Sequence, residues 1–161
     1  IYDEAIEERR TIQPVLDAFG LDYDLDPEAM KLVGVINDNA SYLIYRFKAR
    51  YGRARPWQMC DAKTLGAMFP PGHFLHPGHG AYPSGHATWV HMWVELIGTY
   101  DPANKAKALV AAIEVAERRE IAGLHYPADS DAGRRLGVEI AQRIIKSNRL
   151  TAFEWMALLN K

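Results

Sequence analysis

Helical periodicity is the feature that most restricts the fold of this chain. Between residues 27 and 51, apolar side chains return every three or four positions, which is the spacing of one helix face. They are Met30, Val33, Ile36, Leu43, Ile44 and Phe47. Asp26-Pro27 and Asp101-Pro102 supply a capping residue followed by a proline suited to the first helical position. No segment shows strand-like alternation, so the sequence predicts an all-α, single-domain bundle of about six to seven helices over residues 1–161.

Further helices follow from the same signals. They are predicted at residues 2–18, 83–100, 102–122 and 127–147, with a short last helix beginning at Thr151. Gly123 is expected to close the third of these. Buried faces are predicted from Trp89, Met92, Trp93 and Leu96, and from Leu136, Val138, Ile140, Ile144 and Ile145. Residues 57–80, rich in Pro, Gly, His and Met, are predicted to form a long loop that lines a site.

Composition limits the class of protein. A chain of 161 residues is long enough for one core, and its single cysteine, Cys60, excludes an internal disulfide. The net charge is -1, from 19 basic and 20 acidic residues, which argues against nucleic acid or an anionic membrane as a partner. No run of about 20 apolar residues is present, so no transmembrane segment is expected and the chain is predicted to be soluble. Because the chain begins at Ile1 without Met, a leader already removed and a trimmed chain both stay open.

The turn Pro83-Ser84-Gly85-His86 runs into an apolar-faced helix. With Pro83 at the first helical position, the following amides would point outward from the positive helix end and bind an anion. Ser84 adds a hydroxyl, Gly85 leaves room for a phosphate-sized group, and His86 carries a proton that moves near neutral pH. The alternative interpretation of this turn alone is an ordinary helix cap.

Basic residues gather at the end of the helix predicted over residues 27–51 and just after it. Lys48 and Arg55 are seven positions apart and share one face if the helix continues past Gly52. Arg46, Arg50 and Arg53 are interpreted as a solvated charged face. His73, His76 and His79 recur every third residue in the following loop, and we interpret them as a pocket rim in preference to a metal site.

His125 and Asp129 are four residues apart at a predicted helix start. A hydrogen bond to the carboxylate would fix the imidazole tautomer and leave the other ring nitrogen facing a pocket, as a nucleophile or a ligand for a metal oxyanion. A local cap interaction is the alternative.

Together these motifs resemble the three-part signature of the type 2 phosphatidic acid phosphatase superfamily. They are Lys48 with Arg55-Pro56, Pro83-Ser84-Gly85-His86, and Arg119 with His125 and Asp129. That superfamily includes bacterial nonspecific acid phosphatases and vanadium-dependent haloperoxidases, and this chain resembles the soluble acid phosphatase branch more than the membrane lipid phosphatases. The third motif usually begins Ser-Arg, whereas here Arg118 precedes Arg119.

The resemblance implies a metal-independent phosphomonoesterase with no cofactor. Lys48, Arg55, Ser84, Gly85 and Arg119 would bind the substrate phosphate. His125, oriented by Asp129, would form a phosphohistidine, and His86 would act as acid and then base. These roles agree with the chemistry of phosphoryl transfer, in which donors are placed around three equatorial oxygens.

Two other functions stay open. A vanadate-dependent haloperoxidase would hold vanadate with the same residues that are expected to bind phosphate. A phosphate-binding or phospholipid-binding module would use these residues to bind its ligand without hydrolysing it. The substrate is expected to be a phosphorylated small molecule whose sugar, nucleotide, aryl or lipid part the sequence does not identify. Trp155, Met156 and Leu159 could cover a second copy of the chain as readily as the bundle, so a homo-oligomer stays open. The resemblance suggests a periplasmic or secreted location, with the cytoplasm as the alternative.

Overall fold

The computed structural model describes residues 4–21, 27–59 and 78–147, and within these ranges it is helical without strands. The helices are α1 (Glu4–Ala18), α2 (Pro27–Tyr51), α3 (Pro56–Met59), α5 (Gly85–Gly98), α6 (Lys105–Ile121) and α7 (Pro127–Ser147). The predicted all-α class is therefore confirmed, while the number of domains stays a prediction. None of the described helices is long and apolar enough to cross a membrane.

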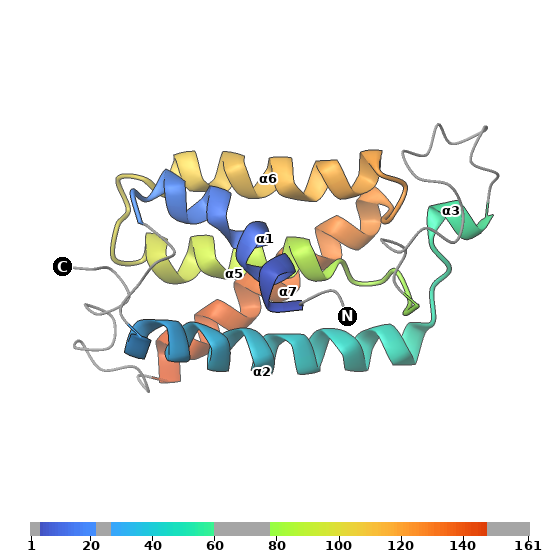
Figure 1. Cartoon of the computed structure of the whole chain (residues 1–161), viewed down its shortest axis with the longest axis horizontal. Coiled ribbons are helices and arrows are strands. Elements are labelled where there is room, and N and C mark those ends of the chain that lie inside the picture. The colour runs from blue at the N-terminus through green and yellow to red at the C-terminus, as the bar shows by residue number, and fades with distance from the viewer. Residues whose placement is uncertain (1–3, 22–26, 60–77, 148–161) are drawn as a thin grey trace.

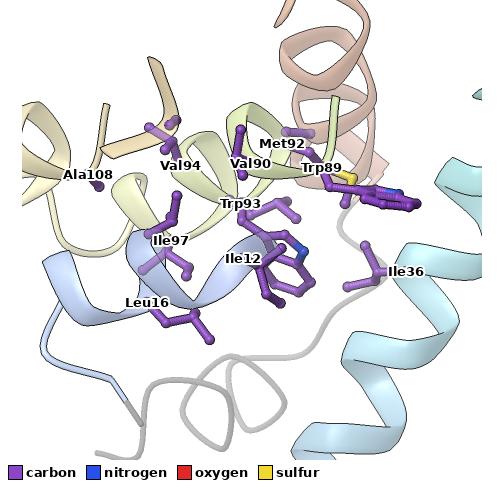
Figure 2. Packing of buried hydrophobic residues seen from close by; sticks show 14 of the residues in the cluster. Ile12, Leu16, Ile36, Trp89, Val90, Met92, Trp93, Val94, Ile97 and Ala108 are labelled. Atoms are coloured by element: carbon purple, nitrogen blue, oxygen red, sulfur yellow. The ribbon is translucent and has the colours of Figure 1, made fainter. Parts of the chain in front are cut away.

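Helix α5 is the central element of the bundle. Figure 1 shows α6 along one side of the molecule and α2 along the other, with α5 between them and α7 crossing it obliquely. The predicted face of α5 is buried, since Trp89, Met92, Trp93 and Leu96 are at most 9% exposed. Figure 2 shows Trp93 of α5 beside Ile12 of α1, with Leu16 of α1 and Ile36 of α2 in the same cluster. The core thus fixes the helix whose first turn carries the Ser-Gly-His sequence.

Two glycines let α7 pack against the backbone of α5. A Cβ added to Gly133 would lie 2.5 Å from the Ser84 carbonyl oxygen, and one added to Gly137 would collide with the Thr88 carbonyl oxygen. Any side chain at these positions would push the helices apart. The beginning of α7, with Asp129, is therefore held against the beginning of α5.

Several element boundaries were predicted well and others were wrong. The bounds of α2 and α7 agree with the sequence, and Gly123 ends α6 at a φ of 71°. Pro83 does not start α5. It precedes the N-cap Ser84, whose hydroxyl accepts from the Ala87 amide, and the Tyr82–Pro83 peptide is cis.

Helix α6 also begins later than predicted. Residues 102–104 form a turn, because the Asp101 carboxylate accepts from the amide and side chain of Asn104, which then becomes the N-cap. Residues 57–59, assigned to a loop, belong to the single turn α3. The rest of that predicted loop up to residue 77, and the helix predicted from Thr151, lie outside the described residues.

The α2 core was predicted only in part. Val33, Ile36 and Ile44 are buried, whereas Leu43 is 39% and Phe47 37% exposed. Helix α2 packs through one narrow face against α5 and lies at the edge of the bundle, which leaves these neighbouring positions toward solvent (Figure 1). On α7, Ile140 is buried and the other predicted core residues are partly buried. Met30 lies among residues whose side chains are not described.

Candidate active site

A sharp turn at Gly52 brings Lys48 and Arg55 together. Gly52 has a φ of 52°, a conformation that favours glycine, and its amide closes α2 on the Lys48 carbonyl oxygen. The helix therefore ends at Tyr51, so it does not continue past Gly52 and Lys48 and Arg55 do not share one helical face. Lys48 projects from the last turn of α2, whereas Arg55 comes from the extended segment that follows. The charge of Arg55 nevertheless acts on Lys48.

Arg55 is the most deeply buried cation of the site, at 1% exposure. Its Nη1 donates to the Leu124 carbonyl oxygen at 2.7 Å and lies 3.5 Å from His125 Nε2, while its Nε donates to the His79 carbonyl oxygen. Burial, then the charge of Arg119, lowers the pKa of Arg55 to about 10, partly offset by Asp129. Arg55 thus joins the first motif to the His125 loop and stays charged at neutral pH.

Lys48 is buried, and its ammonium is held by main-chain carbonyl oxygens. Its Nζ donates to Gly80 at 3.0 Å and to Ala81 at 3.3 Å. Burial, then repulsion from Arg55, lowers its pKa to about 7, against an opposing effect of Asp129. Its partners are neutral carbonyl groups, so a nearby anion would strongly favour the charged ammonium.

Ser84 is the N-cap of α5, as the helix-cap interpretation of this turn expected, and this role leaves it able to contact an anion. Ser84 Oγ accepts from the Ala87 amide with a lone pair, which leaves the hydroxyl hydrogen as a donor. The Ser84 amide donates to the main-chain oxygen of Asp129 at 3.0 Å. This bond ties the second motif to the third.

Gly85 and His86 lie in the first turn of α5. A Cβ at Gly85 would make only ordinary contact, 3.7 Å from a methyl carbon of Ile44, so packing alone does not require glycine there. His86 is half-buried, and its ring centroid lies 5.7 Å from the Trp89 ring. It follows Ser84, whose amide donates to the main-chain oxygen of Asp129, by two residues.

His125 and Asp129 face each other in a buried setting. His125 Nδ1 lies 3.6 Å from Asp129 Oδ2, slightly beyond hydrogen-bond distance, and the side chains are 4% and 0% exposed. Burial lowers the pKa of His125 below its usual range, and the charges of Arg55 and Lys48 act in the same direction against Asp129. With a proton on Nδ1, the ring presents its Nε2 lone pair toward Arg55, and it stays neutral into the acidic range.

Asp129 itself is held as a carboxylate. Burial by itself would raise its pKa, but the His125 ring, the Tyr126 amide and the charge of Arg53 together lower it. The Tyr126 amide donates to Asp129 Oδ2 at 2.9 Å, which is the contact expected of a residue at the start of a helix. Asp129 therefore makes a local cap contact, whereas the predicted hydrogen bond to His125 is not formed and the two groups face each other at 3.6 Å.

Arg119 lies in the last turn of α6, and its charge acts on Arg55. Gly123 turns the chain there, and the Leu124 amide bonds back to the Arg119 carbonyl oxygen, so His125 follows the helix end directly. Arg118 points elsewhere, because it pairs with Glu114 on the exposed side of α6 at 3.0 Å. Arg118 is therefore directed away from the cation cluster.

Arg53 was missed by the sequence interpretation. It was assigned to a solvated face, yet its Nη1 donates to Asp129 Oδ1 at 2.8 Å and its guanidinium lies 4.5 Å from the centre of the Tyr126 ring. Its partner is 76 positions away in the chain, so no local pattern reveals the contact. Arg46 and Arg50 are exposed, as predicted.

The loop histidines offer no metal site within the described residues. His79 lies 3.2 Å from Arg55 Nη2 through its Nδ1, and its ring meets Tyr45 edge-on. No group of three or more His, Cys, Asp or Glu residues gathers in the described part of the chain. His73 and His76 lie outside it.

The described part of the chain is all-α, and it places the buried cations Lys48 and Arg55 near His125 and Asp129. Such an arrangement is suited to binding an oxyanion. Comparison with known proteins supports this class at a coarse level: the chain is 29% identical over 114 residues to a non-specific acid phosphatase of Providencia stuartii. The match covers 67% of this chain and 43% of that protein, so the chain spans less than half the length of this relative. No family model matches the chain. The chain is therefore similar to a phosphatase.

Proposed function

We propose that this chain is a metal-independent phosphomonoesterase of the acid phosphatase type, acting through a phosphohistidine on a phosphorylated small molecule. The observation that supports this most is the excess of buried positive charge. Lys48 and Arg55 are 4% and 1% exposed and repel each other, and the acidic group that offsets both is Asp129. Because buried like charges are costly, an oxyanion bound between them would be strongly favoured.

In the first step, the phosphate binds to Lys48, Arg55 and Arg119, with the Ser84 hydroxyl and the Gly85 amide as further donors. The Nε2 lone pair of His125 attacks phosphorus, the P–N bond forms, and the ester P–O bond breaks. The leaving oxygen takes the electron pair of the broken bond and a proton from His86. The lowered pKa of His125 supports its role, because the imidazole keeps its lone pair in acid.

In the second step, His86 accepts a proton from water as the water oxygen bonds to phosphorus. The P–N bond breaks and its electron pair returns to His125 Nε2, which releases inorganic phosphate. Three fixed cations would stabilise the negative charge on the equatorial oxygens, the part played by metal ions in many other phosphoryl transferases.

The test is hydrolysis of p-nitrophenyl phosphate in EDTA, with labelled phosphoenzyme trapped in alkali. We expect turnover in the native chain and neither turnover nor label in His125→Ala. Arg50→Gln is the control, because it removes an exposed arginine of the same segment and should leave both unchanged. Absence of hydrolysis across a panel of phosphomonoesters would contradict the proposal. So would halide oxidation after vanadate loading without any ester hydrolysis, the result expected of a haloperoxidase.

A further inference from the structure

Arg53 lies where three segments of the candidate site meet. Its Nη1 donates to Asp129 Oδ1 at 2.8 Å, and its guanidinium stacks over the ring of Tyr126. Its main-chain oxygen accepts from the Ala81 amide at 2.8 Å, just before the Ser-Gly-His turn. The residue therefore ties the end of α2 both to the second motif, by its backbone, and to the third, by its side chain.

The Asp129 carboxylate is shared unequally among its neighbours. Oδ1 accepts from Arg53, and Oδ2 accepts from the Tyr126 amide at 2.9 Å, while His125 Nδ1 is more distant at 3.6 Å. The Asp129 side chain is fully buried. Its rotation is thus set by Arg53 and Tyr126, and the His125 ring meets a carboxylate whose orientation is already fixed.

Resting on the phosphohistidine mechanism above, we propose that Arg53 is a positioning residue that fixes the Asp129 carboxylate opposite His125, takes up part of its negative charge, and thereby speeds phosphohistidine breakdown. A phosphorylated imidazole with a proton on Nδ1 is cationic. An Asp129 without a cationic partner would stabilise that cation and resist breakage of the P–N bond. Arg53 weakens this stabilisation, so the electron pair returns to Nε2 more readily when water attacks.

The stacking on Tyr126 explains why an arginine suits this position. The Arg53 side chain is 39% exposed, and a solvated cation would ordinarily gain little from a surface ion pair. Here one partner is fully buried and the guanidinium carbon lies over an aromatic ring, 4.5 Å from its centre, a contact that favours arginine. The guanidinium therefore stays on the buried carboxylate.

The kinetic test compares Arg53→Gln, Arg53→Lys and the control Arg50→Gln in the full chain. In Arg53→Gln we expect kcat to fall about tenfold or more, the scale of one charge-assisted hydrogen bond. The fraction of enzyme trapped as alkali-stable phosphoenzyme at steady state should rise at the same time. Arg53→Lys keeps the charge and should restore most of the rate, and Arg50→Gln should match the native chain. A merely structural role would lower kcat without accumulation of phosphoenzyme.

A second readout does not depend on turnover. Lys48 and Arg55 from the α2 side and Asp129 from α7 act on His125, and removing Arg53 leaves the Asp129 charge less shared. The pKa of His125, followed by NMR titration of the substrate-free protein, should therefore rise in Arg53→Gln and not in Arg50→Gln. If circular dichroism shows that Arg53→Gln does not fold, Tyr126→Leu removes the stacking ring alone and should shift both readouts less, in the same direction.

The outcomes separate this inference from the proposed function. Suppose that the native chain forms a phosphoenzyme, but that the Arg53 variants change neither its fraction nor the pKa of His125. This result overturns the role of Arg53 and leaves the phosphatase proposal standing. No phosphoenzyme in the native chain overturns the phosphohistidine mechanism and, with it, the kinetic role of Arg53.

Discussion

Lys48 is the residue at which burial and charge oppose each other most directly. Its ammonium is held by two carbonyl oxygens, and burial lowers its pKa to about 7. In the unfolded chain the same lysine keeps its proton up to its ordinary pKa of 10.5. Between these values the unfolded state binds more protons than the folded one, so the free energy of unfolding should increase with pH.

We predict that Lys48→Met abolishes this increase. In the native chain the Lys48 contribution should approach about 1.4 kcal/mol per pH unit above pH 7, the slope for one proton. Urea unfolding at pH 6.5 and pH 9 measures it, with the exposed Lys107→Met as the matched control. Equal pH dependence in Lys48→Met and Lys107→Met would show that Lys48 is fully charged in the fold.

Gly85 permits a test that separates binding from folding. A Cβ there would make only ordinary contact with Ile44, so Gly85→Ala should fold with stability within about 1 kcal/mol of the native chain. The proposed phosphate position beside its amide would be obstructed, and kcat/KM should fall about a hundredfold, as expected for a misplaced reacting group. Thermal unfolding and p-nitrophenyl phosphate kinetics measure the two effects. Unchanged kinetics would remove Gly85 from the phosphate site.

At the scale of elements, the crossing of α5 and α7 positions the site. Gly133 and Gly137 lie against carbonyl oxygens of α5, and the same crossing brings the Ser84 amide to Asp129. The site therefore depends on close contact between two helix backbones.

We predict that Gly133→Ala and Gly137→Ala each destabilise the fold by about 1–3 kcal/mol, the cost of an overpacked core position. Gly34→Ala in α2 is the control, because its added Cβ meets nothing within 4 Å and should stabilise the helix. Urea midpoints measure both effects, and activity should fall with stability only in the α7 variants. Equal midpoints for Gly34→Ala and Gly133→Ala would mean that the crossing is looser than these contacts imply.

Local signals predicted the helices better than the contacts between them. Pro27 and Pro127 begin helices where expected because a cap and a fixed φ act within a few residues. Pro83 was misplaced because the Ser84 hydroxyl, one residue later, takes the cap position. Arg53 was read as solvated because its partner, Asp129, lies 76 positions further along the chain. The contact between Arg53 and Asp129 forms only in the tertiary fold, so the run of basic residues around Arg53 does not predict it.

At the scale of the whole molecule, three distant segments close around one cluster of cations. Lys48 and Arg55 come from the end of α2 and the turn beyond it, Ser84 from the cap of α5, and Arg119 from the end of α6. An oxyanion held by all of them binds only the folded chain, so its binding should stabilise the entire bundle.

Sulfate tests this linkage, because it is a tetrahedral dianion whose charge does not change between pH 6 and pH 9. At about 100 times its Kd, sulfate should add about 2.7 kcal/mol to the free energy of unfolding and raise the Tm by roughly 5–10 °C. The dianion favours the charged form of Lys48, so binding takes up a proton and the Tm increase should shrink as the pH rises above 7. Sodium chloride at equal ionic strength is the control for screening. In Lys48→Met, sulfate should raise the Tm less, and this increase should no longer vary with pH. If the variant instead shows the same Tm increase and pH dependence as the native chain, sulfate binds away from the cation cluster.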